Sequence, residues 1–423
     1  MEVKPGYKQT EVGVIPEEWD VGQLSTLISY GPRNGYSGRS GKDARGTPTL
    51  ALTATTSGRM ILDEKTVKHL EETLEGDSDI LLKAGDVLVQ RSNTPELVGT
   101  TAIFDGPSGV YAYPDLMMRM RFKVPETSYW FWRYANSSAG RRYFVSVAAG
   151  STGTMPKLSG DKLRTMPLPL PPPPEQRAIA EALSDVDGLL GGLDRLIAKK
   201  RDLKQAAMQQ LLTGQTRLPG FHGEWDQVKL GSLFSFKNGL NKGKEFFGYG
   251  TPIVNYMDVF GNTGILCSKL EGRVSLTKQE IKNFDVRKGD VLFTRTSETP
   301  EEIGMASVIL DEPDETVFSG FVLRGRPKND ILCDVFKAYC FRAPLVRNQI
   351  ISKASYTTRA LTNGRILSAV TLSVPTKAEQ TAIAEVLTEI DAELAALGQR
   401  REKTRALKQA MMQELLTGRT RLV

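Results

Sequence analysis

The strongest hydrophobic pattern in the chain is a seven-residue spacing that occurs twice. Apolar side chains alternate at steps of four and three residues in 175–213, and the spacing returns in 379–417. This period predicts one long amphipathic helix per segment, with a seam suited to a coiled coil. The predicted seam residues are Ile179, Leu183, Val186, Leu190, Leu193 and Ile197 in the first segment, and Ile383, Leu387, Ile390, Leu394 and Leu397 in the second.

Both predicted helices carry end signals. The first follows the prolines of 171–174, whose fixed φ suits a first helical turn. The second has Thr376 and Glu379 at capping-box spacing. Gly214 and Gly418 follow the last turns, where a left-handed cap is expected.

The seam is interrupted in the middle of each helix by charged residues. Lys199–Arg201 and Arg400–Lys403 break the apolar spacing. It then resumes with Leu203, Ala207 and Leu211, and with Leu407, Met411 and Leu415. A shift of register there is one interpretation. A solvated charged stripe is the simpler one.

The two helical segments are copies of each other. Residues 175–218 and 379–422 align without a gap at an offset of 204, and about 25 of the 44 positions are identical. Two long copies indicate two equivalent halves related by an approximate two-fold axis. Packing of the two helices on each other, antiparallel, is the economical arrangement.

The remaining segments, 1–174 and 218–374, are related more distantly. Short apolar runs such as Val87–Val89 and Val291–Phe293 are separated by Gly, Pro, Asp and Asn, which predicts strands with a few helices. We therefore expect an α/β or α+β fold for each. The predicted order is a first domain at 1–174, a helix at 175–217, a second domain at 218–374 and a helix at 375–423.

Composition adds few constraints. Lys and Arg number 55 against 49 Asp and Glu, a mild excess that suits a polyanion partner without requiring one. The three cysteines lack metal-site spacing, so free thiols in a reducing cytoplasm are expected. The first residues lack the apolar core of a signal peptide, and no run approaches 18 apolar residues, so we expect no membrane span.

Motifs that would indicate catalysis are weak. Phe246, Gly248 and Gly250 match the letters of a methyltransferase cofactor loop, but the residues around them do not read as a strand followed by a helix. No Walker A loop occurs, and His69 and His222 lie in unrelated contexts. The sequence therefore favours a binding chain over an enzyme. A stand-alone DNA nuclease or methyltransferase with an unrecognised site, and a scaffold that binds only protein, remain alternatives.

Three pairs of basic, Gly-rich or hydroxyl-rich segments occupy matching places in the two halves. Such segments suit phosphate contact, and an Arg beside Asn or Ser can read base edges. Solvated loops and structural salt bridges are the competing interpretations. The candidate DNA-binding residues are Arg33, Arg39, Lys42, Arg45, Arg91, Ser92, Asn93 and Lys157 in the first half, and Lys237, Lys242, Lys244, Arg295, Thr296, Lys353 and Arg359 in the second.

The order of motifs along the whole chain resembles the specificity subunit of type I restriction–modification systems. The resemblance is carried by residues 7–19, by Leu168–Asp187, by Leu211–Trp225 and by the second copy at Glu379–Asp391. Val374-Pro-Thr-Lys-Ala stands before Glu379 where the family often has a proline pair, a small departure.

The resemblance implies a non-catalytic subunit that binds double-stranded DNA. Each of two target-recognition domains would read one half of a bipartite, asymmetric sequence. The two helices would set the spacer and dock two modification (methyltransferase) subunits, and restriction (translocase and nuclease) subunits could join the complex. S-adenosylmethionine, ATP and Mg²⁺ would belong to those partner subunits, and this chain would hold no cofactor or metal. Base-reading residues are not transferable, because recognition domains vary between members.

Overall fold

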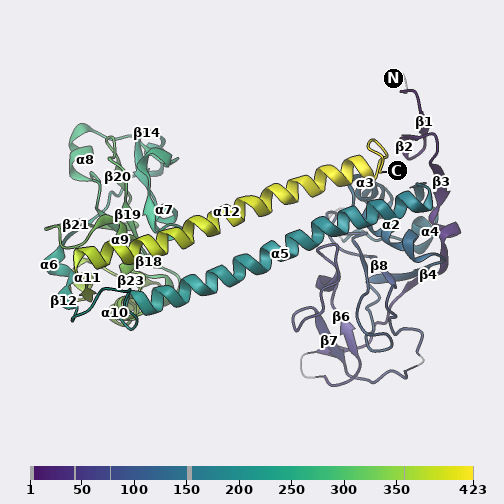
Figure 1. Ribbon diagram of the computed structural model, residues 1–423, viewed down its shortest axis with the longest axis horizontal. Coiled ribbons are helices and arrows are strands. Elements are labelled where there is room, and N and C mark those ends of the chain that lie inside the picture. Colours follow the sequence, from purple (N-terminus) through teal and green to yellow (C-terminus); the bar gives the residue numbers. More distant parts are fainter. Residues whose placement is uncertain (1–3, 42–43, 77, 150–154, 357, 423) are drawn as a thin grey trace. The chain divides into compact units, whose positions relative to one another are not determined.

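A computed structural model describes residues 4–41, 44–76, 78–149, 155–356 and 358–422 (Figure 1). The chain divides into two compact units. Unit 1 contains residues 1–193 and 400–423, and unit 2 contains residues 194–399. Each unit therefore combines one globular domain with parts of both long helices. The sequence placed its boundaries at the helix ends instead.

Unit 1 is organised around a four-stranded antiparallel sheet of order β4-β10-β8-β9. The helix α2 (Pro125–Ala135) packs on β9 and β10 of this sheet. The sheet strands are β4 (Ile28–Asn34), β10 (Met117–Phe122), β8 (Val87–Gln90) and β9 (Thr101–Ile103). The smaller elements of unit 1 are β1 (Tyr7–Thr10), β2 (Gly13–Pro16), β3 (Asp20–Gln23), α1 (Leu24–Leu27), β5 (Ser40–Gly41), β6 (Pro48–Leu50), β7 (Val67–Leu70), α3 (Ser138–Val147), α4 (Gly160–Arg164) and β11 (Pro167–Leu170).

Unit 2 repeats this plan with additions. Its central sheet has the order β13-β21-β17-β19-β15, and α9 (Asp334–Cys340) packs on β19. The sheet strands are β13 (Phe234–Asn238), β21 (Val322–Pro327), β17 (Val291–Thr294), β19 (Ala306–Ile309) and β15 (Gly264–Ile265). The other elements include β12 (Asp226–Lys229), α6 (Leu230–Leu233), β14 (Phe247–Val254), α7 (Tyr256–Phe260), β16 (Arg273–Val274), α8 (Lys278–Asn283), β18 (Thr296–Ser297), β20 (Val317–Phe318), α10 (Pro344–Lys353), β22 (Ser355–Tyr356), β23 (Ala360–Leu361), α11 (Gly364–Ser368) and β24 (Thr371–Val374).

The register of the two sheets is equivalent. Leu88 pairs with Arg119 in unit 1, and Leu292 pairs with Arg324 in unit 2. The edge pairs β3–β11 and β12–β24 also correspond. The mixed α and β content and the duplicated plan confirm the predicted fold class at this level.

The two long helices begin and end close to the predicted residues. They are α5 (Pro173–Leu211) and α12 (Lys377–Leu415). Gly214 and Gly418 both have φ of 71°, as the left-handed caps require. Only half of the capping box at α12 forms: the Thr376 hydroxyl accepts from the Glu379 amide at 3.4 Å, but the Glu379 carboxylate binds elsewhere.

The ends of the long helices are part of the domain cores. Ile179 and Leu183 of α5 and Leu415 of α12 pack with Trp19 and Trp130 in unit 1. In unit 2, Ile383 and Leu387 of α12 pack in the core with Leu211 of α5, Phe293 and Phe336. Each domain core is therefore completed by one end of each helix.

Other expectations concerned cysteines and membranes. Cys267, Cys333 and Cys340 are free thiols, and the first and last of them are buried. In the part of the chain that the structure describes, none of the helices combines the length and apolarity needed to cross a bilayer.

Candidate nucleic-acid interface

Three segments of unit 1 that contain candidate residues, 30–46, 91–93 and the residues around Lys157, meet at the turn that precedes β10. The Gly35 amide donates to the Met117 carbonyl at 3.2 Å, and the Arg91 amide donates to the Leu116 carbonyl at 2.8 Å. The Leu158 amide donates to the Arg91 carbonyl at 2.8 Å, which brings Lys157 to the same place. Segments separated by more than a hundred residues thus form one surface.

Unit 2 assembles its three segments in the same way, at the turn that precedes β21. The Gly320 amide donates to the Leu240 carbonyl at 2.7 Å, and the Arg295 amide donates to the Phe321 carbonyl at 3.0 Å. The Thr362 amide donates to the Arg295 carbonyl at 3.0 Å, which brings in the segment that contains Arg359. Both units therefore bring their three matched segments together, a convergence that the sequence analysis did not predict.

A network of arginines and aspartates, in which Arg119 and Asp86 are buried, anchors strand β10 in unit 1. Arg119 is fully buried and donates to Asp79 and to the Leu81 carbonyl, both at 3.1 Å. Arg121 donates to Asp86 at 2.6 Å. Buried charges are stable only when they are paired and hydrogen-bonded in this way. The network therefore fixes β10 against the neighbouring loop.

The same network occurs in unit 2. Arg324 donates to Asp285 at 2.9 Å, and Arg326 donates to Asp290 at 2.7 Å. Burial alone would raise the pKa of Asp285, but hydrogen bonds from Arg287 and Arg326 outweigh it and hold the pKa below its usual value. The sequence analysis missed both networks, although the Arg-x-Arg pairs and the Gly-Asp pairs before β8 and β17 occur in both halves.

Several predicted residues of unit 1 are engaged within the protein. Arg33 lies on strand β4, not on a loop, and its guanidinium bonds Asp79 and the Tyr30 hydroxyl. Ser92 is only 2% exposed, so we withdraw it as a DNA contact. The Asn93 amide donates to Gln90 at 2.7 Å and its oxygen accepts from the Thr94 amide at 2.8 Å.

Other predicted residues of unit 1 remain open to a ligand. Arg39, Arg45 and Lys157 are exposed, and Arg91 is half-buried. Lys42 lies outside the described residues. The accessible basic groups of the unit 1 surface are thus fewer than the sequence suggested.

Unit 2 likewise divides its predicted residues between internal and open roles. Lys237 lies on strand β13 and donates to the Asn283 carbonyl. Lys242 donates to both oxygens of Glu280, at 2.7 and 2.8 Å. This hydrogen bond, with those from Thr277, lowers the pKa of Glu280 to about 2. Lys242 is therefore a brace between its loop and α8.

The remaining residues of unit 2 present polar groups at the surface. Lys244 and Lys353 are exposed, and Thr296 is half-buried. Arg295 donates to the Gly320 carbonyl at 3.3 Å, and Arg359 lies 3.7 Å from Glu298. Arg359 therefore has a carboxylate partner, as the structural interpretation expects, whereas the hydrogen bond of Arg295 is to a neutral carbonyl.

A tryptophan, a glutamate and an arginine join the helices to each domain. In unit 1, buried Glu175 accepts from Trp19 at 2.9 Å and from Arg421 at 2.6 Å. In unit 2, Glu379 accepts from Trp225 at 3.1 Å and from Arg217 at 2.6 Å. The sequence showed these residues to be repeated but gave no sign that they bind one another.

Ion pairs link the two helices within each unit. In unit 1, Asp187 of α5 pairs with Lys408 of α12 at 2.8 Å. In unit 2, Asp391 of α12 pairs with Lys204 of α5 at 2.5 Å. Later positions on one helix meet earlier positions on the other, so the paired segments run antiparallel in each unit (Figure 1).

The predicted seam residues divide between the domain cores and the middle of the helices. Ile179, Leu183, Ile383 and Leu387 pack in the domain cores, each of which also contains leucines from the end of the other helix. The middle positions Leu190, Leu193 and Ile197 are buried outside those cores, whereas Val186, Ile390, Leu394 and Leu397 are half-buried.

The predicted resumption of the seam is found only in part. Leu203 is 49% exposed and Leu407 is 55% exposed. Leu211 and Leu415 are buried in the domain cores, and Ala207 and Met411 pack against those cores. The neighbouring positions Lys204 and Lys408 make ion pairs with the other helix.

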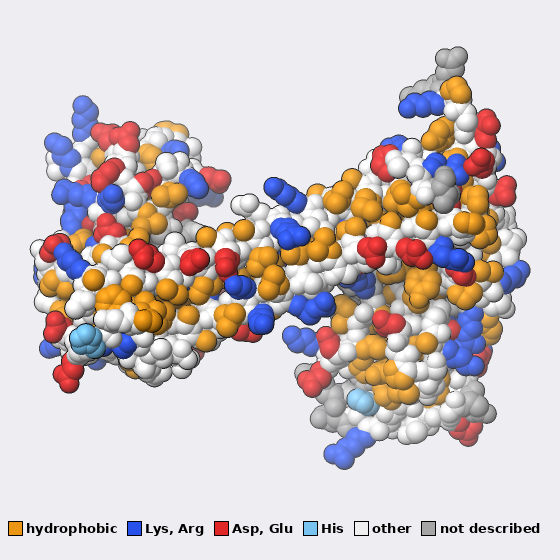
Figure 2. Space-filling model, viewed as in Figure 1, with side chains coloured by type: hydrophobic (Ala, Val, Ile, Leu, Met, Phe, Trp, Pro, Cys, Tyr) orange, Lys and Arg blue, Asp and Glu red, His pale blue; other side chains and the backbone are white. Residues whose placement is uncertain are grey.

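The long helices and the surface of unit 2 differ in the side chains that they expose. Figure 2 shows hydrophobic side chains between charged ones along the long helices, and Lys and Arg side chains gathered on the visible face around α8 and β14. The exposed leucines of α5 include Leu189, Leu196 and Leu203.

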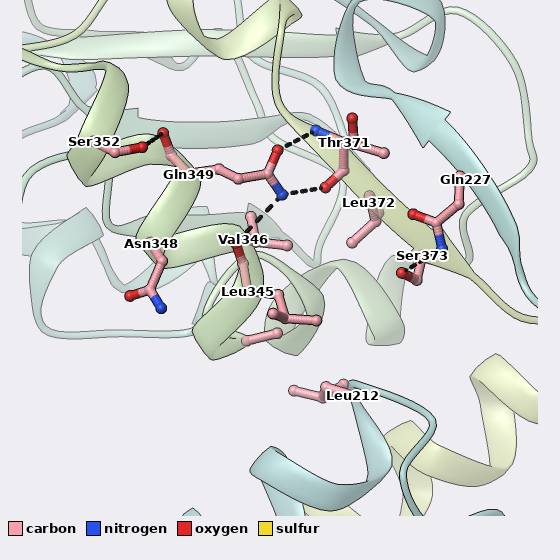
Figure 3. A pocket seen from close by; sticks show the side chains of 11 residues that line it. Leu212, Gln227, Leu345, Val346, Asn348, Gln349, Ser352, Thr371, Leu372 and Ser373 are labelled. Atoms are coloured by element: carbon pink, nitrogen blue, oxygen red, sulfur yellow. Dashed lines mark hydrogen bonds between the residues drawn. The ribbon is translucent and has the colours of Figure 1, made fainter.

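A pocket of about 410 Å³ in unit 2 contains no acid–base chemistry (Figure 3). Leu345 and Leu372 form apolar walls, and the Gln349 side chain accepts from the Thr371 amide and donates to its carbonyl, both at 2.9 Å. None of its lining residues is titratable. Over the described residues there is also no group of three or more His, Cys, Asp or Glu side chains placed to bind a metal ion.

The family model and the similar proteins all point to one family. The family of type I restriction modification DNA specificity domains matches residues 16–197 and again residues 222–404. The MjaX specificity subunit of Methanocaldococcus jannaschii is 23% identical, over 98% of this chain and 97% of the relative. The type I restriction enzyme MjaVIII specificity subunit of the same organism is 22% identical, over 96% of this chain and 94% of the relative.

Solved structures share the fold. A chain from a study of complex assembly and conformational transition of the type I restriction–modification system has a TM-score of 0.58 and 17% identity, and the match covers 96% of this chain and 99% of that chain. The type I restriction–modification S subunit from M. genitalium has a TM-score of 0.54 and 13% identity, with 98% of each chain covered. With two matched domains spanning most of its length, this chain belongs to the family of type I restriction–modification DNA specificity domains, as a non-catalytic specificity subunit with two DNA recognition domains.

Proposed function

We propose that each unit reads one half of a bipartite, asymmetric DNA sequence through the surface where its three segments converge. The observation that carries this proposal is the duplicated convergence: Arg91 with Lys157 in unit 1, and Arg295 with Arg359 in unit 2, gather around the turn before the last sheet strand. Exposed basic groups at this surface suit the phosphate backbone, and half-buried polar groups between them suit base edges.

The long helices have a separate role in this proposal. We infer that α5 and α12 form an antiparallel coiled coil that fixes the number of base pairs between the two half-sites and docks two modification subunits. Burial of Leu190, Leu193 and Ile197 outside the domain cores supports the helix pairing. Half-site spacing in DNA-binding proteins generally follows from protein geometry in this manner.

Chemistry is assigned to the partner subunits. Adenine methylation requires the base to leave the stack and enter an enzyme pocket. The modification subunits would bring S-adenosylmethionine, and restriction subunits would bring ATP and Mg²⁺, in the cytoplasm. This chain would only determine where on the DNA duplex the complex binds.

A domain exchange tests the proposal. Residues 1–174 are replaced by the corresponding domain of a relative, and the chain is expressed with its modification and restriction subunits. Methylation sequencing should show one half-site changed, the other half-site unchanged and the same spacer length. A change in both half-sites, or a new spacer with both helices intact, would contradict the division of labour between the units.

A further inference from the structure

Unit 2 has an apolar hollow beside its converged segments. The hollow has a volume of about 360 Å³ and is formed by α7, β18 and the turn before β21. Phe321 on that turn is 61% exposed, and Met257 on α7 is 66% exposed. Single exposed apolar residues are common, but these two line one hollow together with Tyr256 and Phe260 and so form a local apolar surface that an apolar group could contact.

The hollow is continuous with the proposed DNA surface. The Phe321 carbonyl accepts from the Arg295 amide, and the Arg295 guanidinium bonds the adjacent Gly320 carbonyl. Thr296 and Arg359 line the hollow directly. The exposed phenyl ring therefore lies among the residues assigned to DNA on independent grounds.

The charges that line the hollow favour some chemical groups of DNA over others. Glu298 and Glu302 line it, and Glu302 accepts from the Ser297 hydroxyl at 3.1 Å. Two carboxylates against the single guanidinium of Arg359, which lies 3.7 Å from Glu298, give the hollow a net negative charge that disfavours a phosphate group inside it. They are compatible with the amino groups of adenine and cytosine in the major groove, where the C5 methyl of thymine is the apolar group on offer.

Unit 1 does not repeat this chemistry. The residue whose carbonyl accepts from the Arg91 amide is Leu116, which is half-buried. At this equivalent position, unit 2 therefore presents an exposed phenylalanine and unit 1 a half-buried leucine.

We propose that Phe321, with Met257, contacts the C5 methyl group of a thymine in the half-site bound by unit 2. The proposal rests on the DNA-binding function proposed above and adds the identity of one base to it. A phenyl ring and a thioether would bury the methyl group, and the adjacent carboxylates would keep the backbone phosphates away.

The test removes the methyl group from the DNA and the ring from the protein. The chain is assembled with its modification subunit, and binding is measured on duplexes in which each thymine of the unit 2 half-site is replaced in turn by deoxyuridine. One replacement should weaken binding by the wild-type complex about 3- to 5-fold, the effect of one buried methyl. The same replacement should have no effect on the Phe321→Ala complex.

Matched variants separate this contact from folding. Leu116→Ala, the equivalent change in unit 1, should leave the deoxyuridine effect intact, and Met257→Ala should reduce it. If no position is sensitive to deoxyuridine in the wild type, or if Phe321→Ala retains the full sensitivity, Phe321 does not read a methyl group. In both cases a wild-type complex that still binds its sequence leaves the DNA-binding function standing. A complex with no sequence preference would overturn both proposals.

Discussion

The two recognition domains share a buried scaffold and differ at the surface. In both, an arginine pair on the last sheet strand binds two aspartates, and the sheet registers match. At the surface, the first matched segment of unit 1 presents Arg39 and Arg45, whereas the corresponding segment of unit 2 presents Phe247 and Tyr249 beside Lys244. The difference teaches that paired internal charges keep the backbone constant while the exposed residues remain free to vary.

The helix attachments differ in burial, and this difference predicts unequal stability effects. Glu175 and its partner Trp19 are fully buried, whereas Trp225 beside Glu379 is half-buried. In Glu175→Gln one carboxylate oxygen becomes an amide NH2, which leaves either Trp19 or Arg421 facing a donor in place of its acceptor, and the negative charge opposite Arg421 is lost. The substitution should lower the free energy of unfolding of unit 1 by about 2 kcal/mol. Glu379→Gln should have a smaller effect, because water can reach Trp225.

Thermal unfolding, with hydrogen exchange followed separately in peptides of each unit, measures both changes. Glu18→Gln is the control, since Glu18 also accepts from Arg421, at 2.9 Å, but is exposed. Its effect should stay below about 0.5 kcal/mol. Equal losses for the Glu175 and Glu379 variants would show that the two attachments are energetically alike.

The surfaces should respond differently to salt. Removing Arg39 and Arg45 together should weaken binding to all sequences and reduce the slope of log affinity against log salt by about 2, one per lost phosphate contact. Removing Phe247 and Tyr249 together should weaken binding with the slope unchanged, because no charge is lost. Fluorescence titration of a labelled duplex across a salt series measures both.

The control for the salt series is Lys8→Ala, on β1 and outside the converged segments. It should leave affinity and slope as in the wild type. If the arginine and aromatic variants change the slope by the same amount, the two surfaces do not differ in the number of phosphate groups that they contact, and the prediction is wrong.

The smallest expected effect concerns pH and the Lys242 brace. The folded pKa of Glu280 is about 2, below its usual value of 4.5, so its contribution to stability is present above pH 4.5 and is lost as pH falls toward 2. The midpoint of thermal unfolding of unit 2 should fall over this window, and Glu280→Gln should reduce the fall. An identical pH response in the variant would mean that other carboxyl groups account for it.

The sequence predicted features that depend on local pattern. The helices, their glycine caps and the strands before Arg91 and Arg295 follow from spacing and from the repeat. Features set by long-range packing were not predictable. Ser92 turns inward because successive positions on an extended segment face opposite sides.

Contacts between residues far apart in the sequence were also not predictable. Lys242 finds Glu280 across 38 residues, and the hollow joins Met257 to Phe321, which are remote in the sequence. No periodicity connects such residues, because the chain path that brings them together is fixed by the whole sheet. Basic residues were therefore recognised as candidates, but the sequence gave no means of separating those that brace a loop from those that are free to bind.

The ion pairs between the helices have a consequence for the exchange of domains between related chains. The pair Asp187 with Lys408 and the pair Lys204 with Asp391 use equivalent positions with the roles of the two repeats exchanged. Mutual use of one patch is the hallmark of a self-complementary junction. Exchange of one recognition domain together with a helix that carries Asp and Lys at these two positions would therefore leave the ion pairs of the junction unchanged. Under the proposed function, such an exchange would combine new half-sites without any change in the other helix.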